Sequence, residues 1–132
     1  MKESELILGK REIQKQQVRE RILDEALSLF SERGLEKTTV ADIVGQCGIA
    51  RGTFYNYFPD MNSLFDALIN QLNQRIIEAI QHTRKQTDNL YDYLYGTFKS
   101  YFDLIGSEQM IQFHIVNQAY IRQSSYQSDL IK

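Results

Sequence analysis

The sequence predicts an all-α fold. Apolar residues recur at spacings of three and four through most of the 132 residues, which is the periodicity of helices with one buried face. Strict alternation of apolar and polar residues, the pattern of a half-buried strand, is scarce. Proline occurs once, at Pro59, so little in the sequence interrupts a helical pattern.

Composition limits the classes of protein that this chain can be. Apolar residues make up 42% and charged residues 24%, values typical of a folded globular domain. The single cysteine, Cys47, cannot form an internal disulfide, and His82 and His114 lie too far apart in sequence for a Cys/His metal motif. No apolar run is long enough for a signal peptide or a membrane span. We therefore expect a cytoplasmic protein with no cofactor, no metal and no membrane partner.

The first helix is predicted over Ile13–Arg33, where an apolar stripe follows one face. Gly34 ends it, since glycine readily takes the left-handed conformation that closes many helices. Gly9 separates residues 1–10 from this helix. A solvated, salt-bridged face is predicted for the basic residues that alternate with Glu12 and Glu20, namely Lys10, Arg11, Lys15 and Arg19.

Two short helices follow. Thr39 and Asp42 form a Thr-x-x-acid pattern that predicts a capping box, so a second helix begins after Thr39 and ends near Gly48. A third helix is predicted over Arg51–Phe58, because Pro59 disfavours helical geometry in the residue before it. Two short helices joined by a tight glycine turn are the arrangement of a helix-turn-helix.

A second helical region is predicted beyond this motif. Its elements are a fourth helix capped by Asp60 and reaching about His82, a connection over 83–89, a fifth helix over 90–105, a break at Gly106-Ser107, a sixth helix over 110–121 and a frayed end from Gln123.

In a helix-turn-helix protein the second short helix enters the DNA major groove. Here a spacing of four places Phe54 and Phe58 together, toward the core. The side chains left on the remaining surface suit DNA: Arg51, Thr53, Tyr55, Asn56 and Tyr57. Arg51 can donate two hydrogen bonds to guanine and Asn56 can pair with adenine, while the hydroxyls can reach phosphates. Gly52 lets the backbone approach closely.

The residues from Arg19 to Phe65 read RERILDEALSLFSERGLEKTTVADIVGQCGIARGTFYNYFPDMNSLF. This segment resembles the TetR (tetracycline-repressor-like) family of transcriptional regulators, with the TTV, GTFY and YFP sequences in register. The resemblance implies a homodimer whose N-terminal three helices bind a palindromic operator and whose C-terminal helical domain holds a small-molecule inducer. It divides the chain into a DNA-binding domain over 1–60 and a ligand-binding and dimerisation domain over 61–132, incomplete relative to the family.

The resemblance also implies residue roles. Thr39 matches a phosphate-contacting cap at the start of the second helix. Arg51 and Gly52 match positions that meet bases, and Asn56 matches a variable base-reading position. Two positions match the family's paired aromatic phosphate clamps: Tyr55 and Tyr57.

Three observations depart from this pattern. Met61 stands where a phosphate-binding lysine is common, and Ala50 stands where a capping serine is usual, although alanine caps worse by about 1 kcal/mol. The chain carries a net charge of -2, and residues 1–60 hold nine Lys/Arg against ten Asp/Glu. Phosphate contacts from hydroxyls, backbone N–H groups and helix N-termini add nothing to that balance.

The preferred interpretation is a repressor that a small molecule releases from its operator. An enzyme is disfavoured, because the sequence has no Gly-rich phosphate loop, metal cluster or nucleophile–base motif. The alternative is a helical protein-interaction module that has lost DNA binding. At the level of residues, Tyr55 and Tyr57 can instead pack against a neighbouring helix, and Arg51 can be a solvated charge.

Aromatic residues gather in the predicted fifth and sixth helices, where eight of the fifteen lie between Leu90 and Tyr120. Such residues supply the apolar walls and orienting hydroxyls of ligand pockets. We expect a pocket for an apolar or aromatic effector, lined by Tyr91, Tyr95, Phe98, Phe102, Phe113 and Tyr120. The alternative is that these residues form the core of the second domain, or a surface that further helices cover.

Full affinity for a palindrome needs two copies, because one helix-turn-helix contacts only a half-site. The resemblance places the family's dimer helices beyond the six predicted here. We therefore expect the 132-residue chain to dimerise weakly or through a substitute surface.

Overall fold

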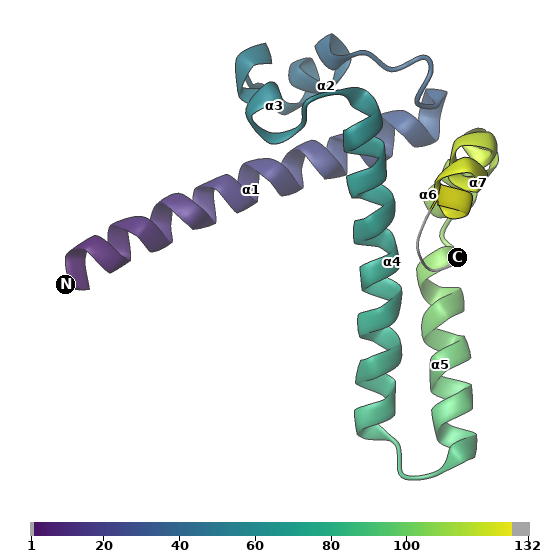
Figure 1. The fold of residues 1–132 in the computed structure, drawn as a ribbon. Helices are drawn as coiled ribbons and strands as arrows, with labels where there is room; N and C mark the ends of the chain where they lie inside the picture. The colour runs from purple at the N-terminus through teal and green to yellow at the C-terminus, as the bar shows by residue number, and fades with distance from the viewer. Residues whose placement is uncertain (1, 128–132) are drawn as a thin grey trace.

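The computed structural model describes residues 2–127, and over that range it contains seven α-helices and no strand. The all-α prediction is confirmed. The helices are α1 (Lys2–Arg33), α2 (Val40–Cys47), α3 (Arg51–Tyr57), α4 (Met61–Gln86), α5 (Leu90–Ile105), α6 (Glu108–Val116) and α7 (Gln118–Gln127). In Figure 1, α2 and α3 lie at one end of α4, α5 runs back alongside α4, and the N-terminal half of α1 projects away from the other helices.

Helix α1 begins earlier than predicted. It runs from Lys2 through Gly9 without a break, whereas the sequence pattern placed its start at Ile13. A glycine inside a helix costs about 1 kcal/mol relative to alanine, which is too little to break the hydrogen-bond ladder. Residues 9–17 are all exposed, so no buried stripe marks this extension. Lys15 lies 3.8 Å from Glu12, as expected for a salt-bridged face.

Helix α4 is longer than predicted, because residues 83–86 are helical and do not belong to the connection. Thr83 is buried where α4 meets α5, and its hydroxyl donates to the carbonyl of Ala79 at 3.0 Å. It faces Gly96, where an added Cβ would lie only 2.5 Å from Thr83 Cγ2. A threonine that packs on a glycine gives no apolar signal, and this explains the error.

The predicted sixth helix is two helices, α6 and α7, separated at Asn117. The buried Asn117 side chain donates to the carbonyls of Phe30 at 2.8 Å and Phe113 at 2.9 Å, and it accepts from the N–H of Leu35 at 3.0 Å. It thereby satisfies the N–H of Leu35 just beyond the end of α1 and adds a second hydrogen bond to the carbonyl of Phe30, which also accepts from the N–H of Gly34. Helix α7 continues to Gln127, so the predicted fraying from Gln123 is wrong up to that residue; positions 128–132 lie outside the described residues.

The core lies where α1, α2, α3, α4 and α6 meet. Its buried apolar side chains are Ile22, Leu23, Ala26, Leu29, Phe30, Leu35, Val40, Ile43, Cys47, Phe54, Phe58, Leu64, Phe65, Leu68 and Phe113. The ring of Phe65 stacks on Phe113, with centroids 5.8 Å apart, and lies 5.6 Å from the ring of Phe30. Helix α5 contributes no buried residue. The domain boundary between residues 60 and 61 remains a prediction, and the core takes side chains from both sides of it.

We predict that Asn117→Ala lowers the free energy of unfolding by about 1–3 kcal/mol, because it leaves the buried N–H of Leu35 without its partner and removes a second hydrogen bond to the carbonyl of Phe30. Urea unfolding followed by circular dichroism measures the change. The matched control is Gln118→Ala at the exposed neighbouring position, where a change within about 0.5 kcal/mol is expected. Equal unfolding midpoints for the two variants would contradict this role for Asn117.

Candidate nucleic-acid interface

The turn between α2 and α3 is closed by Gly48. Its φ of 68° and ψ of 34° are left-handed values that favour glycine, and its N–H donates to the carbonyl of Val44 at 2.9 Å. The N–H of Ile49 donates to the same carbonyl at 3.2 Å. Helix α3 then begins at Arg51, and its N-cap residue Ala50 makes no side-chain cap, as its identity implies. Two short helices around a glycine turn are therefore present as predicted.

Helix α3 has one buried side and one exposed side. Phe54 and Phe58 are buried in the core, as the spacing of four predicted. The opposite surface presents the candidate DNA-contacting residues: Arg51, Gly52, Tyr55 and Asn56 are exposed, and Thr53 is half-buried. The structure therefore brings the predicted base-reading residues together on one solvent-facing surface.

The two predicted phosphate clamps differ in their surroundings. Tyr55 is 45% exposed, and its ring meets the edge of Phe54 with centroids 5.4 Å apart. Tyr57 is half-buried and packs against the core. Packing and a polar contact through the hydroxyl are compatible for a tyrosine, because the ring can be held while the hydroxyl stays wet.

Thr39 forms the predicted capping box at the start of α2. Its Oγ1 accepts from the N–H of Asp42 at 3.2 Å, while the Asp42 carboxylate accepts from the N–H of Thr39 at 2.9 Å. The carboxylate also lies 3.3 Å from the guanidinium of Arg33. Because Oγ1 serves here as an acceptor, the hydroxyl hydrogen of this exposed threonine remains available to donate to a phosphate.

Hydrogen bonds at the two caps shift carboxyl pKa values. The backbone hydrogen bond from Thr39 is the main cause that lowers the pKa of Asp42, with smaller contributions from the Thr39 side chain and from Arg33. The backbone hydrogen bond from Ser63 likewise lowers the pKa of Asp60, which caps α4 as predicted by accepting from that N–H at 2.7 Å.

Two other residues near the motif have packing roles. Met61, which stands in place of a lysine, is half-buried and packs against the core. Arg19 was assigned to a solvated face, but its guanidinium carbon lies 5.5 Å from the centroid of the Phe58 ring. That cation–π contact secures the end of α3, and sequence spacing gives no signal of it because 39 positions separate the two residues.

The six residues predicted to line an effector pocket do not share a cavity. Tyr91, Tyr95, Phe98 and Phe102 are exposed on α5. Phe113 is fully buried in the core. Tyr120 packs against the core, and the centroid of its ring lies 6.2 Å from that of Phe65.

A different set of residues encloses a cavity of about 370 Å³ between α1, α4, α5, α6 and α7. Its lining combines apolar side chains, among them Leu72 and Ile76 of α4, Tyr101 and Leu104 of α5 and Met110 of α6, with polar ones that include Arg75 and His114. The helical spacing of Leu72 and Ile76 was readable in the sequence, but the partner helix across the cavity was not.

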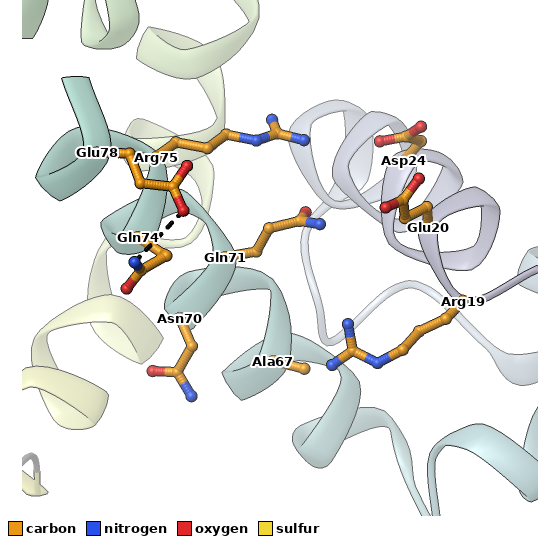
Figure 2. Close-up of a pocket in the computed structure, with 9 residues that line it drawn as sticks. All are labelled: Arg19, Glu20, Asp24, Ala67, Asn70, Gln71, Gln74, Arg75 and Glu78. Carbon is orange, nitrogen blue, oxygen red and sulfur yellow. Dashed lines mark hydrogen bonds between the residues drawn. The ribbon is translucent and has the colours of Figure 1, made fainter. Parts of the chain in front are cut away.

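A larger cleft of about 660 Å³ lies between α1 and α4. Figure 2 shows that its side chains are mostly polar, with Arg19 reaching from α1 toward Ala67 and Arg75 reaching from α4 toward Asp24. Its acidic residues offset the two arginines, so the cleft favours no ligand of one charge.

Among the residues that the structure describes, no group of three His, Cys, Asp or Glu side chains is placed to hold a metal ion. None of the described helices is long and apolar enough to cross a membrane.

The fold and the α2–α3 surface define a helix-turn-helix protein. Residues 22–68 match the family described as "Bacterial regulatory proteins, tetR family". Similar curated proteins include the uncharacterized HTH-type transcriptional regulator YvdT of Bacillus subtilis, 40% identical over 47% of this chain and 32% of its own length. The HTH-type transcriptional repressor KstR2 of Mycobacterium tuberculosis is 31% identical over 64% of this chain and 42% of its own length.

Solved structures of TetR family regulators share this fold. The ketosteroid transcriptional regulator KstR2 of Mycobacterium tuberculosis superposes with a TM-score of 0.67 at 26% identity, over 83% of this chain and 55% of that one. A TetR family transcription regulator from Marinobacter aquaeolei shares the fold with a TM-score of 0.71, over 92% of this chain and 61% of that one. Residues 22–68 therefore place the helix-turn-helix of this chain with that of the TetR family, and the fold of the solved regulators extends over most of the chain. It spans less than half the length of the two curated relatives named above.

We predict that Asp42→Asn flattens the acid limb of the stability curve. A carboxyl with a lowered pKa in the folded state contributes stability above its unfolded-state pKa, and this contribution is lost as the pH falls through the lowered value. The wild-type chain should therefore lose more stability below about pH 4 than the variant does. Urea midpoints between pH 7 and pH 2 test this, with Asp66→Asn, an exposed aspartate that caps no helix, as control. Parallel curves for wild type and Asp42→Asn would rule out the capping role.

Proposed function

We propose that this protein is a sequence-specific DNA-binding transcriptional regulator, a repressor that binds a palindromic operator as a homodimer and is released by a small apolar or aromatic molecule. The main support is that α3 has a buried side and an exposed side. Phe54 and Phe58 are buried, and Arg51 and Asn56 are exposed. The match of residues 22–68 to the TetR family and the similarity to the transcriptional repressor KstR2 support the same function.

In the proposed complex α3 lies in the major groove. Arg51, at the first position of the helix, donates a bidentate pair to guanine, and Asn56 pairs with adenine. Gly52 is exposed with nothing within 4 Å of where a Cβ would stand, so its surface can lie close to the duplex. The hydroxyls of Thr39, Tyr55 and Tyr57 hold phosphates and set the position of α3 in the groove.

The net charge of -2 makes the electrostatic part of this binding weak. Affinity for DNA falls with salt in proportion to the number of phosphates that cations neutralise. Arg33, which lies near the capping box, is already paired with Asp42. Hydrogen bonds from neutral groups therefore carry most of the proposed phosphate contacts, and a shallow salt dependence follows.

We predict that Arg51→Ala and Asn56→Ala each cost about 1–3 kcal/mol of binding and relax preference at particular base pairs. Tyr57→Phe should weaken binding to all sequences alike, because it removes a phosphate contact. Selection of bound DNA from a random pool, followed by titration of the selected sites, measures both effects.

The control is Arg84→Ala, an exposed arginine near the far end of α4 from the helix-turn-helix. It should leave the selected sequence unchanged. If wild type selects no sequence and Arg51→Ala behaves like Arg84→Ala, the chain is better described as a helical interaction module.

The proposed effector site is the cavity of about 370 Å³ bounded by Leu72, Ile76, Tyr101 and Met110. Its volume falls within the usual range for small-molecule sites. The similar protein KstR2 is a ketosteroid transcriptional regulator, and ketosteroids are apolar molecules with a few polar groups. An effector releases DNA only if it binds better to the conformation that fits the operator poorly, since equal affinity for both shifts nothing.

We predict that Ile76→Trp abolishes ligand-induced stabilisation, because the larger side chain fills the cavity. Thermal-shift screening with ketosteroids and aromatic acids as probes identifies a binder in the wild type, and the same titration is then repeated on the variant. The matched control is Ile77→Trp, one position along α4 and outside the cavity lining. A binder that stabilises both variants equally would place the site elsewhere.

A further inference from the structure

Arg33 is the last residue of α1, and its side chain reaches the start of α2. Its Nη1 atom lies 3.3 Å from Oδ2 of Asp42, and the same oxygen accepts from the N–H of Thr39 at 2.9 Å. The guanidinium and the backbone of Thr39 therefore meet at one carboxylate oxygen. Figure 1 shows the end of α1 at the same end of the molecule as α2 and α3. Arg33 thus lies beside the threonine that holds a phosphate in the proposed complex.

The loop between α1 and α2 is held in place just after Arg33. Gly34 has a φ of 86°, a left-handed value that favours glycine, and its carbonyl accepts from the hydroxyl of Thr38 at 2.7 Å. The N–H of Leu35 donates to the buried side chain of Asn117 at 3.0 Å. Leu35 and Thr38 are themselves buried. Because the backbone is fixed, less conformational freedom is lost when the arginine side chain binds a partner.

The ion pair with Asp42 leaves part of the guanidinium available. The side chain of Arg33 is 40% exposed, and its contact with the carboxylate is made through Nη1. An arginine carries five N–H donors in a planar fork, so donors remain for a second partner. Exposed ion pairs contribute little to folding stability. The main effect of this pair is therefore to orient the guanidinium.

A phosphate at Thr39 also approaches the carboxylate of Asp42. The backbone hydrogen bond from Thr39 is the main cause that lowers the pKa of Asp42, so this carboxyl is ionised at neutral pH. An ionised carboxylate repels a phosphate unless a cation lies beside it. Arg33 occupies that position, at 3.3 Å.

The sequence offers few other cations near the motif. Residues 34–74 contain two, Lys37 and Arg51. Lys37 follows Glu36, which offsets its charge, and Arg51 is assigned to a base in the proposed complex. Met61 stands where the resembled family commonly has a phosphate-binding lysine. Arg33 is therefore the cation best placed to bind a phosphate.

We propose that Arg33 binds the DNA phosphate that Thr39 contacts, and that Asp42 holds the guanidinium in position for it. This inference rests on the proposed function, and it adds one charged contact made from α1. In the complex the Thr39 hydroxyl donates to one phosphate oxygen and the guanidinium donates to another. The contact carries no sequence information, because every nucleotide has a phosphate.

Arg33→Gln tests the contact. Affinity for DNA falls with salt in proportion to the number of phosphates that cations neutralise, so the slope of log affinity against log salt should become shallower by about 1. At low salt the affinity should fall about tenfold or more, because a charge-assisted hydrogen bond is lost. The loss should be equal for the duplex that the wild type selects from a random pool and for an unrelated duplex. Fluorescence anisotropy titrations between about 50 and 200 mM potassium chloride measure both effects.

Three further variants separate a phosphate contact from other roles of Arg33. Arg33→Lys keeps a cation and should keep the salt slope of the wild type. In an Asp42→Asn background, Arg33→Gln should still make the slope shallower, whereas an arginine that only neutralises Asp42 would have no effect there. Arg84→Gln, near the far end of α4 from the helix-turn-helix, removes one exposed charge and should leave the slope unchanged. Circular dichroism confirms that each variant is folded before titration.

A salt slope that Arg33→Gln leaves unchanged, in a wild type that selects a sequence, overturns this proposal and leaves the proposed function standing. An effect that disappears in the Asp42→Asn background overturns it as well. So does a loss confined to one base pair, which would assign Arg33 to a base. A wild type that binds no duplex refutes the proposed function and this contact together.

Discussion

The arrangement of the helices depends on the aromatic contacts that the ring of Phe65 makes. It lies within 6.2 Å of three other rings, those of Phe30 in α1, Phe113 in α6 and Tyr120 in α7. Because Phe65 belongs to the second turn of α4, the same contacts that join α1 to α6 also hold the first turns of α4, which follow directly after α3. Close-packed aromatic rings resist small displacements, so the C-terminal helices help to hold the helix-turn-helix in position.

Asn117 adds hydrogen bonds to this aromatic packing. Its side chain binds backbone groups on both sides of Gly34, at the point where α1 ends and the loop toward Thr39 begins. The proposed effector cavity is bounded by Leu27 of α1, Leu72 of α4 and Met110 of α6, helices that also build the core. A molecule that enlarged this cavity would act on the same packing that positions α3, without touching the DNA-facing residues. The proposed coupling between the effector cavity and α3 therefore needs no further chain of residues to connect them.

Features that depend on neighbouring residues could be predicted from the sequence, and features that depend on distant partners could not. The capping box of Thr39 and Asp42, the Asp60 cap and the left-handed Gly48 each involve residues at most four or five positions apart. At Asn117, where α6 and α7 separate, the side chain bonds to residues more than 80 positions away, and Thr83 in the last turn of α4 packs on Gly96 of another helix. The aromatic composition of α5 and α6 predicted an effector pocket there, but composition does not show which side of a helix each ring faces. Phe113 is buried in the core, whereas Phe98 is exposed.

The acidic balance of the chain would give the proposed dimerisation a larger role than it has in a basic DNA-binding protein. A strongly basic domain gains affinity for any duplex from counterion release, so a single motif already binds measurably. This chain has a net charge of -2 and gains little in that way. In the proposed complex each copy would rely on a few directional contacts from α3, and the second copy would contribute by raising the effective concentration of the other motif at its half-site. Occupancy of the proposed operator would then follow the concentration of the proposed dimer.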